Sequence, residues 1–255
     1  MYAQKLRKLR YKRKKRSSIT AIAGAVVSLI IFGIILSSSN GKPAAGSGGL
    51  TYTPAEGLSA ADGIHAGEPV GDKKRIVIDP GHGGSSSPGC VYDGVRESDL
   101  NLAMAFRVRD YLKELGYDVV LTREDDSPMS LADRAAFAEN VKAGVFISIH
   151  HNALENDTVT EGIETWYNDE TNSANVTLAG YIQNETSNIT DAKNRGLKVS
   201  KRMVHLQGTS MPACLIEVGF LSSDKERERL INSKYQDKIA QGIVNGIEMF
   251  FMSRE

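Results

Sequence analysis

Short apolar runs alternate with longer amphipathic segments along residues 75–252, and the two spacings predict strands and helices in turn. The first run, Ile76–Ile78, is continuous and β-branched, which is typical of a strand buried on both faces. Comparable runs occupy 118–122, 145–149, 161–167 and 213–218. The apolar pattern therefore predicts five strands.

Amphipathic segments lie between these runs. Ser98 is predicted to cap a helix that ends at Gly116, because the apolar residues between them fall on one helix face. These residues occupy positions i, i+4, i+7, i+8 and i+11: Met104, Val108, Tyr111, Leu112 and Leu115. Ser130, with Asp133 three residues later, predicts the start of a second helix that runs through Asn140.

Two further helices complete the pattern, over 172–189 and from about Ser233 onwards. The last helix places four apolar side chains on one face: Ile239, Ile243, Ile247 and Phe250. Strands that alternate with helices form parallel sheets covered on both faces. We therefore expect an α/β fold over 73–255, a single three-layer domain with a mostly parallel sheet and helices on both faces.

The first 72 residues differ in composition. Residues 5–16 hold nine lysines and arginines and no acid, and residues 19–36 carry no charge. A run of about 18 apolar residues can cross a bilayer as a helix, and its basic flank stays in the cytoplasm. We predict a basic cytoplasmic segment at 1–18 and one transmembrane helix at 19–36. Residues 37–72, rich in Ser, Gly, Ala and Pro, are expected to form a flexible linker.

Alternatives exist for both N-terminal features. The basic run could be a nucleic-acid or nuclear-import patch, although it adjoins a membrane-length segment. The apolar run could be a buried helix or a cleaved signal peptide, since Ser37–Ser39 would suit a peptidase. Because the apolar stretch is longer than the usual signal core, we favour an uncleaved anchor. The protein is then expected in the cell membrane, single-pass, with its folded domain outside the cytoplasm.

The zero net charge of the whole chain hides an asymmetry. The chain has 31 Lys and Arg and 31 Asp and Glu, so removing the nine N-terminal cations leaves 22 against 31, or −9. This charge disfavours nucleic acid, whose binding relies on cations that release counterions. Only Cys90 and Cys214 occur, which excludes a disulfide scaffold. The two could pair, but we expect free thiols.

Two histidines come where predicted strands end. His82 lies in a glycine-rich loop directly after the first strand, where Pro80 and the glycines force a tight turn, and His150 follows the strand 145–149. Because ligands bind at the carboxyl edge of parallel sheets, we expect the two imidazoles to be neighbours there. Glu97 precedes a helix whose start faces the same edge. Two histidines and a carboxylate form a catalytic zinc set with an open fourth position.

Glu217 is the candidate proton carrier. It lies in an otherwise apolar strand, where a carboxylate is costly unless it is paired or used. It could instead pair with a buried arginine, and Glu97 could be a solvated acid that complements the helix dipole. His151 should point away from His150 if the strand continues. We expect His151 and His205 to pack or to lie at the surface rather than to bind metal.

Four ordered blocks carry these residues: IDPGHGG (78–84), RESDLNLA (96–103), SIHHNA (148–153) and IEVGFLSS (216–223). Together with TREDD and SLADRAAFAEN between them, they resemble the zinc-dependent N-acetylmuramoyl-L-alanine amidases, the amidase type 3 family of bacterial cell-wall hydrolases. The likeness covers roughly residues 74–252. It implies that His82, Glu97 and His150 are ligands of Zn²⁺ and that Glu217 is the catalytic glutamate.

The resemblance implies a peptidoglycan substrate and cleavage of the amide between N-acetylmuramic acid and L-alanine of the stem peptide, in cell-wall or spore-cortex remodelling. A catalytically inactive peptidoglycan-binding module of the same fold is the alternative, although all four key residues are present. GHGGSSSPG matches neither GxxxxGK[ST] nor GxGxxG, and no G-x-S-x-G elbow occurs. Whether an activator protein is needed stays open.

Some details depart from the family's pattern. The loop after GHGG reads SSSPG where many members have an aspartate before the proline, and Ser223 stands where asparagine is common. The segment Glu155–Gly162 is short, which suggests a cleft without a helical guard.

An acidic domain must also meet a carboxylate-rich substrate. Basic residues that could offset the repulsion include Arg123, Arg134 and Arg195.

Overall fold

The computed structural model describes residues 75–169 and 171–254. The predicted cytoplasmic segment, transmembrane helix and linker fall within residues 1–72 and lie outside the described part. Among the residues that are described, no helix combines the length and the apolar character needed to cross a membrane.

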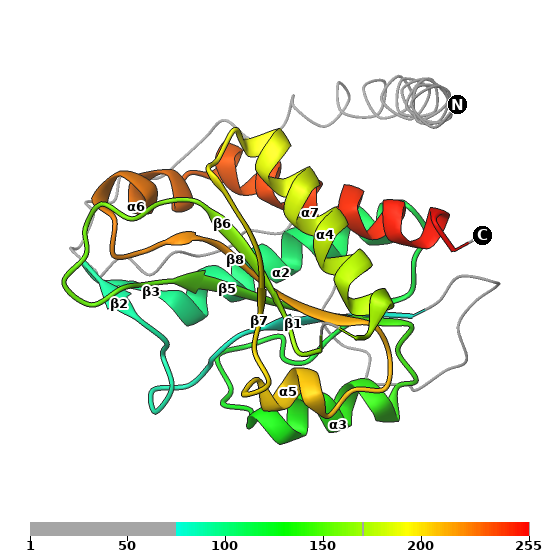
Figure 1. The fold of residues 1–255 in the computed structure, drawn as a ribbon. Helices are drawn as coiled ribbons and strands as arrows, with labels where there is room; N and C mark the ends of the chain where they lie inside the picture. The colour runs from blue at the N-terminus through cyan, green and yellow to red at the C-terminus, as the bar shows by residue number, and fades with distance from the viewer. Residues whose placement is uncertain (1–74, 170, 255) are drawn as a thin grey trace, which may run out of the picture. The chain divides into compact units, whose positions relative to one another are not determined.

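A six-stranded sheet forms the centre of the described part (Figure 1), in the order β4-β1-β5-β8-β6-β7. Its strands are β1 (Ile76–Pro80), β4 (Val119–Leu121), β5 (Val145–Asn152), β6 (Ile163–Tyr167), β7 (Asn194–Val199) and β8 (Ala213–Phe220). The first four strands in this order are mutually parallel, whereas β6 runs antiparallel to β8 and parallel to β7. The expectation of a mostly parallel sheet is confirmed. A separate two-stranded hairpin consists of β2 (Val91–Tyr92) and β3 (Val95–Arg96).

Helices cover both faces of the sheet, as predicted (Figure 1). One face packs against the three long helices α2 (Glu97–Glu114), α4 (Ser173–Thr190) and α7 (Ser233–Met252). The other packs against α3 (Leu131–Asn140) and α5 (Val204–Gln207), which are only 10 and 4 residues long. Helix α6 (Asp224–Leu230) follows β8. Helices α4 and α7 approach closely because Gly242 and Gly246 leave room: an added Cβ at either would lie 2.5 Å from a backbone atom of α4.

The alternation of side chains along the strands positions the functional residues. Odd and even residues of a strand point to opposite faces. On the α3/α5 face, apolar residues such as Val77, Phe146 and Leu215 fill the first half of each strand. Polar residues follow on the same face toward the carboxyl ends: Asp79, Ser148, His150 and Glu217. Within this polar row Asp79 and Ser148 are fully buried, whereas His150 and Glu217 are half-buried, so the last two are the residues available to a site.

Some sequence predictions need correction. Helix α2 begins at Glu97, and Arg96 rather than Ser98 is its N-cap, with no side-chain capping bond. Ser98 lies buried in the first turn. Strand β5 continues beyond Ile149, so His150 and His151 belong to the strand. Strand β7 and helices α5 and α6 were not expected, because they are short or carry mostly polar residues.

Other local predictions are confirmed. The Ser130 hydroxyl accepts the backbone N–H of Asp133 at 3.1 Å and starts α3. Gly116 follows α2 with φ +80°, a left-handed conformation that glycine adopts freely. Cys90 and Cys214 are free thiols.

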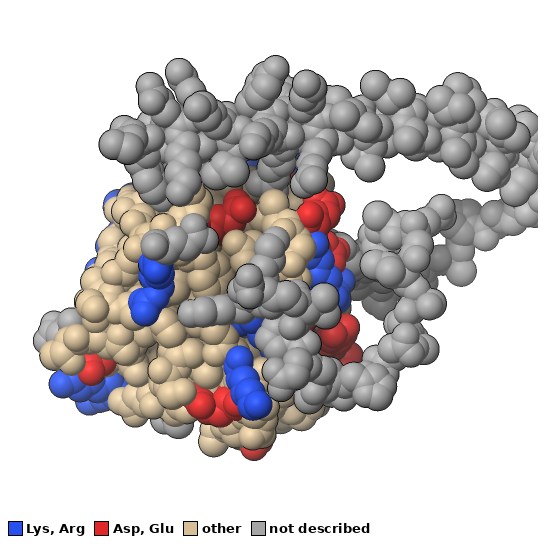
Figure 2. All heavy atoms as spheres, turned by 90° about the vertical axis from the view of Figure 1, so that its right-hand side faces the viewer, with Lys and Arg blue, Asp and Glu red and all other residues tan. Residues whose placement is uncertain are grey.

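On the face seen in Figure 2, the described Lys and Arg side chains are scattered among Asp, Glu and uncharged residues and form no continuous basic surface.

Candidate metal centre and catalytic site

Three predicted ligands come together at the carboxyl edge of the sheet. His82 follows β1, Glu97 is the first residue of α2, and His150 lies in β5. One ligating atom from each residue lies within 4.8 Å of the others. The Glu97 Oε2 atom is 3.4 Å from His82 Nε2, and Oε1 is 2.9 Å from His150 Nδ1. The imidazole centroids are 5.0 Å apart.

Electrostatics keep Glu97 ionised. Burial alone would raise the pKa of this carboxyl, but its hydrogen bonds to His150 and His82 outweigh burial and hold the pKa well below 4.5. The backbone N–H of Cys90 also donates to Oε2 at 3.0 Å. Two imidazoles around a carboxylate form a donor set that suits a divalent transition metal, so these three residues could hold one.

Two glycines leave the space that this cluster occupies. A Cβ on Gly81 would lie 2.1 Å from His150 Nε2, and a Cβ on Gly89 would lie 2.4 Å from Glu97 Oε2. Gly89 also has φ +71°, in the left-handed region. The loops that carry these glycines can therefore pass directly against the His150 ring and the Glu97 carboxylate.

A buried amide connects the three segments of the cluster. The Asn101 Nδ2 group donates to Glu97 Oε1 at 3.3 Å and to the Gly81 carbonyl at 3.1 Å. Its Oδ1 atom can only accept, so His151 Nδ1, which lies 2.7 Å away, carries the hydrogen and donates it. His151 points away from His150 and is buried, as predicted, and burial lowers its pKa to about 4. His151 is therefore a neutral packing partner of the cluster.

The loop that carries His82 is held by two buried arginines. Arg134 donates to the carbonyls of Pro80 and His82 at 2.8 and 2.7 Å. Arg123 donates to the carbonyls of Pro80 and Gly81 at 3.0 and 2.9 Å. His82 has φ +60°, uncommon for a residue with a side chain, and these bonds hold that backbone. Contrary to expectation, neither arginine is available to bind an acidic substrate.

Glu217 lies next to the cluster on the same face of the sheet. Its backbone pairs in register with His150 of β5 and with Glu164 of β6. Its Oε2 atom is buried and has no hydrogen-bond partner among the described residues. Burial and then the negative charges of Glu97 and Glu164 raise the pKa of Glu217 well above 4.5. The alternative of an ion pair between Glu217 and a buried arginine is not seen in the described part.

A second acid, Glu164, flanks Glu217 on the other side. Its Oε1 accepts from Asn152 Nδ2 and Trp166 Nε1, each at 3.1 Å, and its Oε2 accepts from Arg195 Nε at 2.8 Å. The carboxylate of Glu164 is therefore fully paired, whereas that of Glu217 is not.

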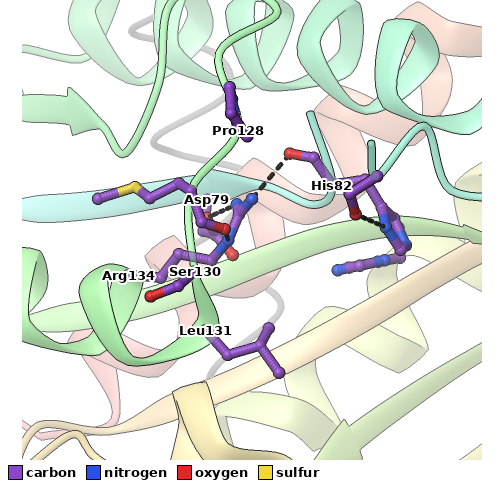
Figure 3. A pocket seen from close by; sticks show the side chains of 9 residues that line it. Asp79, His82, Pro128, Ser130, Leu131 and Arg134 are labelled. Carbon is purple, nitrogen blue, oxygen red and sulfur yellow. Dashed lines mark hydrogen bonds and ion pairs between the residues drawn. The ribbon is translucent and has the colours of Figure 1, made fainter. Parts of the chain in front are cut away.

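A cavity of about 450 Å³ opens beside the cluster, toward the start of α3 (Figure 3). His82 and His150 form part of its wall. The opposite wall is made by the segment before α3 and its first residues, with Pro128, Met129 and Leu131. The two candidate histidine ligands, His82 and His150, therefore face open space large enough for part of a substrate.

Fold and site together define a class of protein. A three-layer α/β domain with a His–Glu–His cluster and an adjacent acid that has a free oxygen within the described part is suited to hydrolysis, because a metal could activate the reacting groups while the acid moves protons.

Comparisons with known proteins give the family. A sequence profile described as N-acetylmuramoyl-L-alanine amidase matches residues 76–249, and the chain belongs to this family. It is 35% identical over 195 residues to the germination-specific N-acetylmuramoyl-L-alanine amidase of Bacillus subtilis, covering 71% of this chain and 81% of that protein. The expected family is confirmed.

Solved structures agree. An N-acetylmuramoyl-L-alanine amidase from Clostridium difficile 630 superposes with a TM-score of 0.69 and 38% identity, over 72% of this chain and 99% of that one. The CwlD amidase of Clostridioides difficile, solved in complex with the GerS lipoprotein, gives a TM-score of 0.68 and 33% identity, over 71% of this chain and 100% of that one.

The structure brings the four predicted site residues together and adds two neighbours that the sequence analysis did not single out, Asn101 and Glu164. Asn101 lies one helical turn after Glu97, and that spacing was the available signal. Glu164 is an acid within a predicted strand, the same signal that singled out Glu217.

Proposed function

We propose that the chain is a zinc-dependent peptidoglycan hydrolase that cleaves the amide between N-acetylmuramic acid and L-alanine of the stem peptide, in cell-wall or spore-cortex remodelling. The observation that carries the proposal is the His82–Glu97–His150 cluster with Glu217 beside it, whose Oε2 has no hydrogen-bond partner among the described residues. Membership of the amidase family supports the reaction and its spore-cortex or cell-wall context. An inactive binding module is not favoured, because every residue that the reaction requires is present.

The donor set fits Zn²⁺, which favours imidazole nitrogen and carboxylate oxygen in catalytic sites with one position left open. When bound, Zn²⁺ supplies Lewis acidity that makes water a nucleophile near pH 7 and polarises the amide carbonyl. His82, Glu97 and His150 would hold the ion. Asn101 and the backbone N–H of Cys90 keep the Glu97 carboxylate in place.

Glu217 moves the protons. Its carboxylate accepts a proton from the attacking water, and its protonated form then donates that proton to the leaving nitrogen of L-alanine. Burial and the neighbouring acids raise the pKa of Glu217, which strengthens its carboxylate as the base that takes the proton of water. The leaving amine therefore lies on the Glu217 side of the cluster.

The test measures metal content and reaction together in the purified chain. We expect one zinc per chain and release of new L-alanine amino termini from peptidoglycan, lost with a chelator and regained with added zinc. His82→Ala should lose both zinc and release. The matched control is His205→Leu, which removes a buried histidine whose ring nitrogens have no partner among the described residues and should keep both. Release that persists in zinc-free protein would contradict the proposal.

Zinc without release would instead indicate a missing partner. The CwlD relative was solved in complex with a lipoprotein, which makes a dependence on a partner protein worth testing for this chain. Adding an extract of the source cells to the zinc-loaded chain would then restore release if an activator is required.

We also propose that residues 19–36 anchor the protein in the cell membrane and hold the hydrolase domain outside the cytoplasm. The basic flank and the uncharged run support this arrangement. The chain should be found with membranes, and protease added to intact protoplasts should remove its domain. A domain protected from the protease would contradict the predicted orientation.

A further inference from the structure

Arg195 differs from the other two arginines considered for substrate charge. Its side chain is 26% exposed, whereas Arg123 and Arg134 are buried and donate to backbone carbonyls. Its Nε atom donates to Glu164 Oε2 at 2.8 Å. None of the contacts described for Arg195 uses its Nη1 or Nη2 group. The outer edge of its guanidinium therefore offers two parallel N–H donors.

The guanidinium is also held in one orientation. It stacks over the ring of Phe220 at 4.8 Å, and the Glu164 carboxylate beneath it is itself fixed by Asn152 and Trp166. A guanidinium held in place loses little entropy when it binds a planar oxyanion. The nearby carboxylate of Asp157 does not compete strongly, because it already accepts bonds from Thr160 and from two backbone N–H groups.

The position of Arg195 follows from strand register. His150, Glu217 and Glu164 are in-register neighbours on β5, β8 and β6, so they follow one another across the sheet. Neighbouring strands are about 5 Å apart. The metal cluster comes first, Glu217 second, and the Glu164–Arg195 pair lies one strand beyond Glu217. The direction from β5 through β8 to β6 therefore leads from the His82–Glu97–His150 cluster past Glu217 to Arg195.

The direction matches the substrate. The leaving nitrogen must lie near Glu217, so the stem peptide extends past it toward β6. Residue two of that peptide, which follows L-alanine, is an acidic residue whose carboxylate lies two residues from the leaving nitrogen. An extended chain spans at most about 3.6 Å per residue, so this carboxylate lies within about 7 Å of that nitrogen. That reach is comparable to the distance from Glu217 to the next strand.

We propose that Arg195 binds the carboxylate of the stem-peptide residue that follows L-alanine, through its two Nη groups, and so selects a free carboxylate over a carboxamide. The inference rests on the proposed function, which orients the substrate. Because Glu164 already balances the charge of Arg195, the selection depends on paired hydrogen bonds rather than on net charge. A carboxamide breaks the pair, since its NH₂ group cannot accept from an Nη donor.

The experiment compares two muropeptides that differ only in carboxylate or carboxamide at this position. The wild-type chain should favour the carboxylate substrate by about 10- to 100-fold in kcat/KM, mostly through KM. Arg195→Gln should lose this preference, and Arg195→Lys should keep only part of it, since lysine lacks the planar fork. The amidated substrate should react at a similar rate with all three proteins.

Two control variants test whether a change in selectivity is specific to Arg195. Arg195→Gln leaves Glu164 buried without its cation, so the double variant Glu164→Gln/Arg195→Gln, which removes both charges, tests selectivity if the single variant folds poorly. Lys225→Gln removes an exposed lysine paired with Glu161 and should leave selectivity unchanged. Equal rates on both substrates with the wild-type chain, or a preference that survives in Arg195→Gln, would overturn the proposal.

Peptide binding separates this inference from the proposed function. The free stem peptide, in carboxylate and carboxamide forms, is titrated calorimetrically into the zinc-loaded wild-type chain. Binding that favours the carboxylate and is lost in Arg195→Gln, without any cleavage of muropeptides, would support the carboxylate subsite while the proposed reaction fails. Cleavage with no difference between the two peptide forms would support the reaction and reject the subsite.

Discussion

Asp79 and Glu217 are two acids on the same face of one sheet, near the carboxyl ends of β1 and β8, yet their surroundings are opposite. Asp79 accepts from Arg134 Nη1 at 2.6 Å and from the hydroxyls of Thr122 and Ser148 at 2.5 and 2.7 Å. Glu217 Oε2 has no partner among the described residues. Position in the sheet therefore does not decide what an acid on this face does; the donors around it do.

The pKa values follow this difference. Burial alone would raise the pKa of Asp79, but Arg134 and the two hydroxyls outweigh it and lower the pKa below 3.8. Burial raises the pKa of Glu217, and two neighbouring carboxylates raise it further. Asp79 thus stabilises the arginine that holds the His82 loop. The ionised form of Glu217 lowers the free energy of unfolding. The same surroundings raise its pKa and so give it a proton affinity that suits catalysis.

The largest expected effect is on turnover in Glu217→Gln. The amide keeps the size of the side chain but carries no transferable proton, so kcat should fall by about 10²- to 10⁴-fold. Zinc content should stay close to that of the wild-type chain, and the thermal midpoint should not fall, because the change removes a carboxylate that is costly in the folded state. Turnover near the wild-type value would remove Glu217 from the mechanism, and lost zinc would mean that it supports the metal site instead.

The next effect is on stability in Asp79→Asn. This change leaves Arg134 as a buried cation without its counter-ion, so the free energy of unfolding should fall by about 3–5 kcal/mol. Chemical denaturation of the metal-free chain measures it, and Glu217→Gln is the matched control on the same face. Equal stability of the two variants would contradict the comparison.

A smaller effect is expected for Thr122→Val, which removes one of the three donors to Asp79 and keeps the shape of the side chain. Loss of a hydrogen bond to a charged group should lower the free energy of unfolding by about 1.5–3 kcal/mol. The matched control is Thr177→Val, whose hydroxyl bonds a carbonyl on the exposed side of α4 and whose loss should cost about 0.5 kcal/mol or less. If the two valine variants unfold with equal free energies, the Thr122 hydroxyl does not stabilise Asp79.

Sequence reasoning succeeded where local pattern decides the structure. Continuous apolar runs gave the buried strands, and helical spacing gave the long helices, because each must bury one face. It failed for β7, whose residues NRGLKV are half-buried and polar, and for α6, whose residues DKERERL have no apolar periodicity. The Ser223 cap of α6, with Glu226 three residues later, was a usable signal that was overlooked.

The candidate site divides in the same way. His82, Glu97, His150 and Glu217 could be predicted because strand ends gather at one edge of a parallel sheet and because an acid in an apolar strand is conspicuous. The partners of Asp79 could not, since they come from positions 43, 55 and 69 residues away and depend on register. Sequence thus located Glu217, but it could not show that Asp79 has donors and that Glu217 Oε2 has none among the described residues.

The smallest expected effect, opposite in sign for the two acids, is on the pH dependence of stability in the metal-free chain. For Asp79 the folded pKa lies below 3.8, so its stabilisation is complete above that value and is lost as pH falls through the folded pKa. For Glu217 the folded pKa lies above 4.5, so stability is highest below 4.5 and falls as pH rises toward the folded pKa.

Denaturation between pH 3 and pH 7 should therefore show Glu217→Gln gaining stability relative to the wild-type chain as pH rises. Asp79→Asn should lose least at the lowest pH. A Glu217→Gln difference that stays constant with pH would mean that the unpaired carboxyl is not protonated by its surroundings, and the contrast with Asp79 would then rest on hydrogen bonds alone.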